Sequence, residues 1–102
     1  MAELDQLGVS QRDVEAFCRQ WKVRELSLFG SALRDDFAPG SDVDLLVELP
    51  PHHELSLYDW VDMIDQLREI FGRDVDLVAK SGLSNPIRRR EILHTAKVLY
   101  AA

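Results

Sequence analysis

Two stretches decide the fold of this chain: Leu28-Phe29-Gly30-Ser31-Ala32-Leu33-Arg34 and Gly40-Ser41-Asp42-Val43-Asp44-Leu45-Leu46-Val47. The first predicts an apolar strand that ends at Gly30, and the second predicts a turn followed by another strand. Successive side chains of a strand point to opposite faces, so Asp42 and Asp44 share a face, with Cα atoms roughly 6.5 Å apart. The second strand therefore opens with a pair of carboxylates.

The residue types in these stretches suit a metal ion and a phosphate. Two carboxylates at this spacing can converge on one hard cation, and Mg²⁺ is commonly held by one or two carboxylates together with substrate phosphates. Gly30 lets backbone N–H groups approach a phosphate closely, and a helix starting at Ser31 would add its positive end. The alternatives are a solvated strand start for Asp42 and Asp44 and a plain turn for the Gly-Ser pair.

The arrangement resembles the nucleotidyltransferase superfamily that includes DNA polymerase beta, and within it the minimal nucleotidyltransferases, which are small antitoxin-like proteins paired with HEPN partners. Their signature is Gly-Ser, ten residues and Asp-x-Asp. Here it is Gly30-Ser31, residues 32–41 and Asp42-Val43-Asp44. A second Asp-x-Asp follows at residues 74–76, and the order of elements fits the family across most of the chain.

The resemblance implies the functional residues. It implies catalytic and metal-binding carboxylates at Asp42, Asp44 and Asp76, and nucleotide binding by Gly30, Ser31, Arg34 and Ser41. Asp74 lies on the same strand face as Asp76 by alternation, so it is the alternative candidate for the third carboxylate. A surface ion pair with Asp35 or Asp36 is the alternative for Arg34. Relatives often carry glycine after this arginine, whereas this chain has Asp35.

The activity implied by the resemblance is transfer of AMP from ATP to a hydroxyl group with the help of Mg²⁺, two ions being usual in such transfers. In the minimal family the acceptor is typically a tyrosine of the HEPN toxin, which the modification silences. The alternative is a non-catalytic antitoxin or adaptor that neutralises its partner by binding alone. A third reading is a sensor that binds metal or nucleotide without turnover.

The periodicity of the rest predicts one α/β domain over residues 1–102, a small mixed, twisted sheet with helices packed on one face. Helices are expected at residues 11–21 and 57–71 and from Pro86 to about residue 95, with Ser10 and Ser56 as N-caps of the first two. Strands are expected at residues 24–29, 42–49 and 74–79. Residues 97–100 could finish the last helix or form an edge strand, and the family resemblance favours the strand.

Composition narrows the partners and the compartment. A net charge of −6 argues against bulk nucleic-acid binding, which depends on neutralising phosphates with Lys and Arg. No apolar run approaches the ~20 residues of a membrane span, and the N-terminus is acidic rather than signal-like. A single cysteine, Cys18, excludes an internal disulfide and favours the cytoplasm, and its position on an apolar helix face predicts a core residue.

Two further clusters stand outside this scheme. Arg88-Arg89-Arg90 places cations near the start of a helix, which opposes the helix dipole. It indicates an anionic partner surface, the phosphates of a nucleotide, or a solvated face. His52 and His53 offer too few convergent ligands for a metal site. The oligomeric state is left open, a homo-oligomer included.

Overall fold

The computed structural model describes residues 8–29, 42–51, 54–83 and 85–102. In this part of the chain, three α-helices run over Gln11–Trp21 (α2), Leu57–Phe71 (α3) and Pro86–Thr95 (α4), and a short 3-10 helix (η2) spans Lys80–Gly82. The strands are Glu25–Phe29 (β1), Val43–Glu48 (β2), Val75–Ala79 (β3) and Lys97–Ala101 (β4). The strand alternative for residues 97–100 is therefore confirmed.

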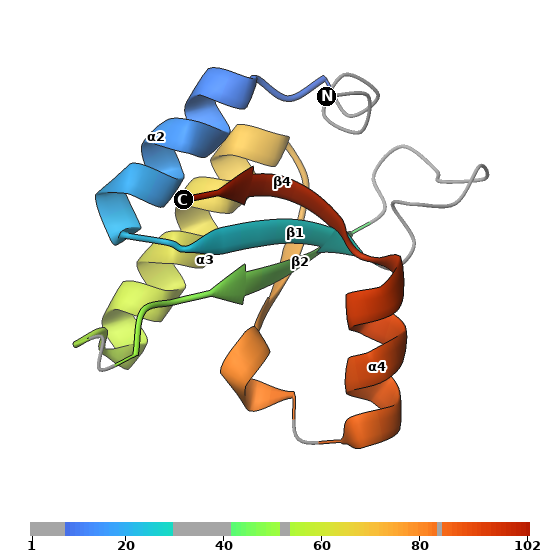
Figure 1. The fold of residues 1–102 in the computed structure, drawn as a ribbon. Helices are drawn as coiled ribbons and strands as arrows, with labels where there is room; N and C mark the ends of the chain where they lie inside the picture. The colour runs from blue at the N-terminus through green and yellow to red at the C-terminus, as the bar shows by residue number, and fades with distance from the viewer. Residues whose placement is uncertain (1–7, 30–41, 52–53, 84) are drawn as a thin grey trace.

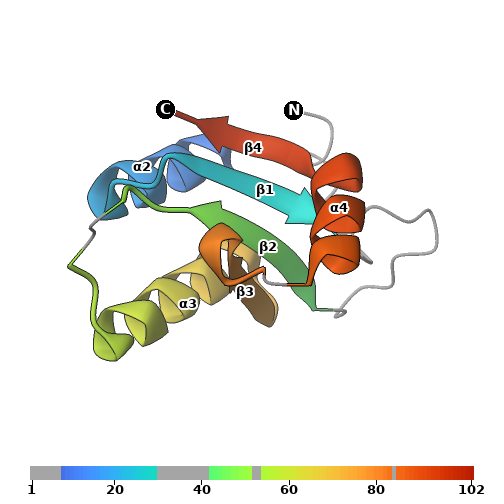
Figure 2. The ribbon, with the colours of Figure 1, turned by 60° about the horizontal axis from the view of Figure 1, so that its bottom comes forward.

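The four described strands form one mixed sheet in the order β3-β2-β1-β4 (Figures 1 and 2). β1 pairs antiparallel with both β2 and β4, whereas β2 pairs parallel with β3. The parallel pair is connected by α3, as a β-α-β unit requires. Among the described strands, β1 and β2 occupy the centre of the sheet, and β3 and β4 lie at its two edges.

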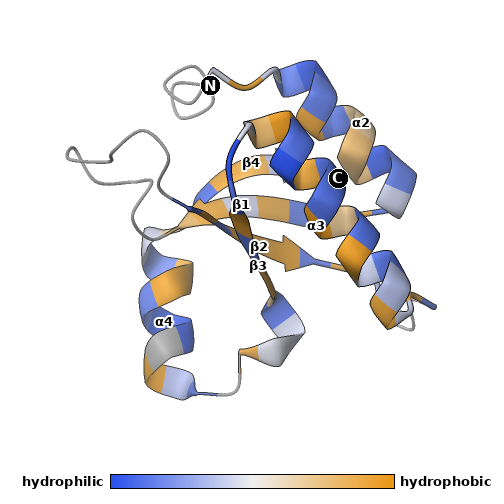
Figure 3. Ribbon diagram, turned by 180° about the vertical axis from the view of Figure 1, so that it is seen from behind, coloured by the Kyte–Doolittle hydropathy of each residue, from blue (hydrophilic) through white to orange (hydrophobic). Residues whose placement is uncertain are grey.

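The main core lies between the sheet and the helices α2 and α3. Each strand gives alternate residues to this core, such as Leu26 and Leu28 from β1 and Val43, Leu45 and Val47 from β2. Figure 3 shows the mainly hydrophobic ribbon of β1 and β2 behind the mixed ribbons of α2 and α3. The hydrophobic sides of these two helices pack on the sheet and exclude water from the sheet face that carries the main core.

A second, smaller core lies on the opposite face of the sheet. Its buried residues are Phe29, Leu46, Leu83 and Ile92, the last of which comes from α4. The turned view of Figure 2 separates α4 from α2 and α3. The expected α/β class with a small mixed sheet is confirmed, with the refinement that α4 covers part of the face that α2 and α3 leave open.

Local signals explain where α3 begins and ends. The Ser56 hydroxyl accepts the N–H of Asp59 at 3.1 Å, and the Asp59 carboxylate accepts the N–H of Ser56 at 2.9 Å, which forms a capping box. Gly72 ends the helix with a positive φ of 68°, a conformation that glycine adopts without strain. Ser10 precedes α2 as expected, but its side chain makes no capping hydrogen bond.

Within the described residues, no helix is both long enough and apolar enough to cross a bilayer.

Candidate active site

Asp44 and Asp76 lie side by side on the parallel strands β2 and β3. They are direct partners in the register of this pair, and neighbouring strands lie about 4.8 Å apart. Asp44 is half-buried, whereas Asp76 is exposed. Asp44 alternates with Val43 and Leu45 of the main core, so the two carboxylates belong to the sheet face that carries the second core.

Asp42 directly precedes β2 and is exposed. The backbone N–H of Val43 donates to the carbonyl of Asp74 at 2.9 Å, which fixes the start of β2 against the start of β3. Because Asp42 lies two residues before Asp44, all three predicted carboxylates lie at the same end of the parallel pair.

Asp74, the alternative to Asp76, forms an ion pair away from the candidate site. Its carboxylate lies 3.0 Å from the guanidinium of Arg68 on α3, a helix of the opposite sheet face. Asp76, in contrast, stands in register with Asp44. The arrangement therefore favours Asp76 as the third carboxylate of the candidate site.

The donor set suits magnesium without forming a closed cage. Among the residues that the structure describes, no group of three His, Cys, Asp or Glu side chains converges as a metal site. Mg²⁺ usually takes one or two carboxylates and completes its coordination with water and substrate phosphates, so an open pair of aspartates fits it better than a dedicated cage would. Asp42 and Asp44 would supply these two carboxylates, and Asp76 is the register partner of Asp44 on the neighbouring strand.

The residues expected to bind the nucleotide, Gly30, Ser31, Arg34 and Ser41, lie outside the described residues, as do His52 and His53. The segment that holds the first four joins the end of β1 to the start of β2. Phe29, the last residue of β1, is the register partner of Asp44 across the antiparallel pair. The described residues that flank this segment, Phe29 and Asp42, therefore lie at the same end of the sheet as Asp44.

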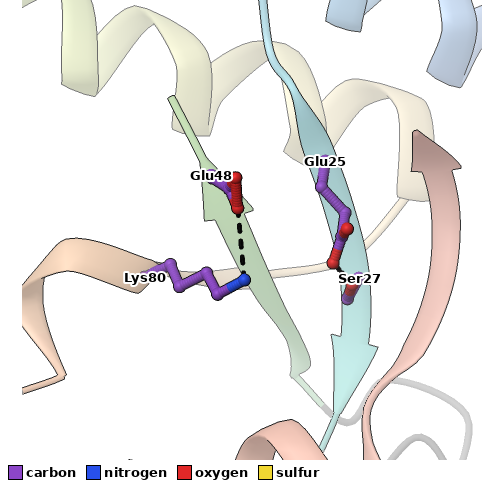
Figure 4. Close-up of polar contacts among 4 residues, drawn as sticks. All are labelled: Glu25, Ser27, Glu48 and Lys80. Atoms are coloured by element: carbon purple, nitrogen blue, oxygen red, sulfur yellow. Dashed lines mark hydrogen bonds and ion pairs between the residues drawn. The ribbon is translucent and has the colours of Figure 1, made fainter. Parts of the chain in front are cut away.

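The same sheet face carries a polar row that the sequence did not reveal. Lys80 Nζ lies 3.1 Å from Glu48 Oε2, and the Ser27 hydroxyl donates to Glu25 Oε1 at 3.4 Å (Figure 4). Ser27 is 2% exposed and is a buried polar residue. Glu48 and Lys80 of this row line a cavity of about 580 Å³, together with Arg24 and Arg89. The sequence signal for this row is the alternation of polar residues at positions 25 and 27. That they share a face with Glu48 is evident only once β1 is paired with β2.

Two other sequence expectations can be located. Cys18 is fully buried, and burial, with a smaller contribution from the charge of Glu15, raises the pKa of its thiol from 9.0 to about 12. It is a core residue, as predicted. In the arginine run, Arg89 borders the cavity of the polar row, whereas Arg90 borders a groove on the outer side of α4.

Comparison with known proteins gives one family match and similar relatives. The nucleotidyltransferase domain family matches residues 12–99, a range that includes every candidate site residue. The protein adenylyltransferase MntA of Thermococcus cleftensis is 37% identical over 78 residues, which cover 71% of this chain and 74% of the relative.

Solved structures share the fold. A chain of a toxin–antitoxin crystal structure with AMP-PNP matches with a TM-score of 0.72 and 21% identity, over 92% of this chain and 75% of that one. A chain from the structure of a tri-AMPylated Shewanella oneidensis HEPN toxin in complex with an MNT antitoxin matches with a TM-score of 0.64 and 21% identity, over 90% of this chain and 70% of that one.

Proposed function

The chain belongs to the nucleotidyltransferase domain family and is a nucleotidyltransferase enzyme, and we propose that it transfers AMP from ATP to a hydroxyl group of a HEPN-type toxin, for which it acts as antitoxin. The observation that carries the proposal is the register of Asp44 with Asp76, which adds a third carboxylate to the Asp-x-Asp pair at residues 42–44. A protein that only binds its partner has no need of three carboxylates at one end of a sheet, because like charges repel one another without a cation.

Each carboxylate has a role in the proposed transfer. Asp42 and Asp44 would hold Mg²⁺, which when bound neutralises the charge that develops on the phosphates. Asp76 is the general base that takes the proton of the acceptor hydroxyl. The hydroxyl oxygen bonds to the α-phosphorus, the bond between this phosphorus and the oxygen that bridges to the β-phosphate breaks, and pyrophosphate leaves.

The triphosphate is assigned to the segment between β1 and β2. In this proposal the backbone at Gly30 and the hydroxyls of Ser31 and Ser41 bind phosphate oxygens, and Arg34 balances the charge of the leaving pyrophosphate. The assignment rests on the spacing of Gly-Ser and Asp-x-Asp. It is consistent with AMP-PNP in the structural neighbour.

Relatives support a toxin protein as the acceptor, whereas the choice of a tyrosine in it rests on the family resemblance. The Thermococcus cleftensis relative is a protein adenylyltransferase, and the toxin in the Shewanella oneidensis complex is AMPylated. We assign a tyrosine hydroxyl of a HEPN-type toxin as the acceptor here, and AMP transfer as the event that silences it.

The test is intact-mass spectrometry of the candidate toxin after incubation with this protein and Mg²⁺-ATP. The expected result is a mass gain of whole AMP units, lost when Asp44→Asn replaces the wild type and retained with Asp74→Asn as the matched control. Peptide mapping then identifies the acceptor residue. A toxin that is bound and silenced without a mass gain would overturn the transferase proposal in favour of a binding-only antitoxin, and Mg²⁺-dependent ATP binding without product would favour a sensor.

A further inference from the structure

The cavity at the end of β2 has a positively charged lining. Its volume is about 580 Å³, and its charged lining residues within the described part of the chain are Arg24, Glu48, Lys80 and Arg89. Three cations against one carboxylate give this lining a formal charge of +2, in a chain whose net charge is −6. We call it the basic cavity, and its excess of cations favours an anionic ligand.

Three different elements bring these cations together. Arg24 directly precedes β1, and its backbone N–H donates to the carbonyl of Glu48 at 2.9 Å, which places it beside the end of β2. Lys80 begins η2 directly after β3, and Arg89 comes from α4. Like charges held close by the fold repel one another until an anion is bound between them.

The internal ion pair of the cavity leaves both guanidiniums available to a ligand. Lys80 Nζ lies 3.1 Å from Glu48 Oε2, as Figure 4 shows. The ion pairs that join two described residues involve only Arg68 and Lys80 as cations, so neither Arg24 nor Arg89 takes part in one. Both of these arginines are exposed. The basic cavity therefore offers two exposed guanidiniums without an ion pair to another described residue.

A neighbouring carboxylate does not fill this role. Glu25 is the register partner of Glu48, but it is not among the described residues that line the basic cavity. Its Oε1 accepts the Ser27 hydroxyl at 3.4 Å. An anion from outside is thus needed to balance the two guanidiniums.

The charge and the geometry of the donors suit a phosphate monoester. A guanidinium binds phosphate through two parallel N–H···O hydrogen bonds, which an ammonium group cannot do. A phosphate monoester carries a charge of about −1.5 to −2 near pH 7, whereas a carboxylate carries a single charge. The phosphate monoester therefore matches the formal charge of the lining more closely.

An apolar wall lies beside the cations. Leu49, Pro50, Pro51 and Ala79 also line the basic cavity, and all of them except Pro51 are half-buried. The volume falls within the range of about 300–1,000 Å³ that is usual for small-molecule sites. A ligand that fills the cavity should therefore carry an organic body with an apolar face in addition to its phosphate.

We propose that the basic cavity binds a nucleoside monophosphate. Its phosphate lies between Arg24 and Arg89, and its nucleoside packs against Pro50 and Pro51. Glu48 and Asp44 belong to the same face of β2, and Glu48 follows Asp44 by four residues, so the two ends are about 13 Å apart. The basic cavity is thus a second nucleotide site, and it requires neither the carboxylates of the candidate active site nor a metal ion.

Isothermal titration calorimetry with AMP in the presence of EDTA is the first test. We expect saturable 1:1 binding that weakens with added salt, and Arg24→Gln and Arg89→Gln each to lower the affinity about tenfold or more. Arg90→Gln is the matched control, because Arg90 is an exposed residue of the same helix that lines a different groove. An equal loss with Arg90→Gln would overturn the assignment, since a general effect of net charge would then explain the binding.

Glu48→Gln should increase the affinity for AMP. The amide oxygen of glutamine can still accept a hydrogen bond from Lys80, but the one negative charge of the lining is gone. We expect binding to tighten about threefold or more, a gain that damage to the fold would not produce. Circular dichroism checks that each variant is folded, and an unchanged or lower affinity would contradict the placement of the phosphate in this cavity.

Two further ligands separate the phosphate from the nucleoside. Adenosine should not bind measurably, and inorganic phosphate should bind about tenfold more weakly than AMP, because it leaves the apolar wall uncovered. Phosphate that binds as tightly as AMP would overturn the choice of a nucleotide, and adenosine that binds as tightly would overturn the role of the cations. Absence of AMP binding at millimolar concentration would overturn the site itself. These titrations contain neither Mg²⁺ nor a toxin, so their outcome is independent of whether AMP transfer is found.

Discussion

The indole N–H of Trp21 donates a hydrogen bond to the side-chain oxygen of Gln66 at 3.1 Å, and this bond joins the last residue of α2 to the middle of α3. The two helices share the main core, but this bond is polar and directional. It fixes how the end of α2 meets α3.

Removing this hydrogen bond should lower stability measurably. For Trp21→Phe we expect the free energy of unfolding to fall by about 1 kcal/mol, the usual net worth of a partly buried hydrogen bond. Urea unfolding followed by circular dichroism measures it. A double-mutant cycle with Gln66→Met separates the bond from the change in ring size, and a coupling energy near zero would mean that the bond contributes nothing.

The capping box at Ser56 makes a second prediction about stability. Ser56→Ala removes the acceptor for the N–H of Asp59 and should lower the free energy of unfolding by about 1 kcal/mol. Ser10→Ala is the matched control, since Ser10 precedes α2 without a capping hydrogen bond, and it should change stability by less than about 0.5 kcal/mol. Equal effects of the two substitutions would contradict the assignment.

Lys22 offers a stabilising substitution. It ends α2 with a φ of 57°, a left-handed conformation that costs energy for any residue with a Cβ. Lys22→Gly should therefore raise the free energy of unfolding by about 0.5–1 kcal/mol, net of the greater chain entropy of glycine. The converse change, Gly72→Ala at a φ of 68°, should lower stability, and urea unfolding compares the two.

The Cys18 thiol should be inert in the folded protein. Because its pKa is raised to about 12, almost no thiolate is present near pH 8, and iodoacetamide should alkylate it only after unfolding in urea. Mass spectrometry of the alkylated protein measures the extent.

The same pKa shift implies a dependence of stability on pH. Between pH 9 and about 12 the unfolded thiol loses its proton while the folded thiol keeps it, so the stabilisation is complete below pH 9 and is lost as the pH rises through this window. Cys18→Ala should reduce the slope of unfolding free energy against pH in that range. An unchanged slope would contradict the assignment.

Substitution of Asp76, which lies in β3, should affect catalysis far more than substitution of Asp74, which directly precedes β3. If Asp76 is the general base, Asp76→Asn should lower kcat by a factor of about 10²–10⁴. Asp74→Asn should leave kcat nearly unchanged and cost at most about 1 kcal/mol of stability, because its pair with Arg68 is more than half exposed. Single-turnover AMP transfer measures both variants, and the reverse order of effects would exchange the two roles.

Most of the fold could be predicted from the sequence, because its signals are local. The apolar stripe of residues 57–71 and the Ser56–Asp59 pair predicted α3 with its cap. Ser10 shows the limit of such signals, since the residue type was right but the hydrogen bond is absent. The sheet face that α4 covers was not predictable. The sequence of α4 has no continuous apolar stripe, and one apolar position such as Ile92 does not indicate on which face of the sheet the helix packs.

The candidate site could be predicted only in part. The Gly-Ser and Asp-x-Asp spacing indicated Asp42 and Asp44, but Asp74 and Asp76 are equivalent by alternation alone. Their difference depends on tertiary contacts, namely the ion pair of Asp74 with Arg68 and the register of Asp76 with Asp44. The polar row of Glu25, Ser27, Glu48 and Lys80 was missed for the same reason, since its members come together only when β1, β2 and η2 are assembled.

The two strands that carry Asp44 and Asp76 differ in how deeply they are buried by the two cores. β2 is paired on both edges and is buried on both faces through Val43, Leu45, Val47 and Leu46, so its amides should exchange with deuterium only when the whole domain unfolds. Among the described strands β3 lies at an edge of the sheet, and Leu77 is its one buried residue. We therefore expect slow amide exchange on the strand that carries Asp44 and faster exchange on the strand that carries Asp76, so local opening of β3 would change the separation of the two carboxylates while the domain stays folded.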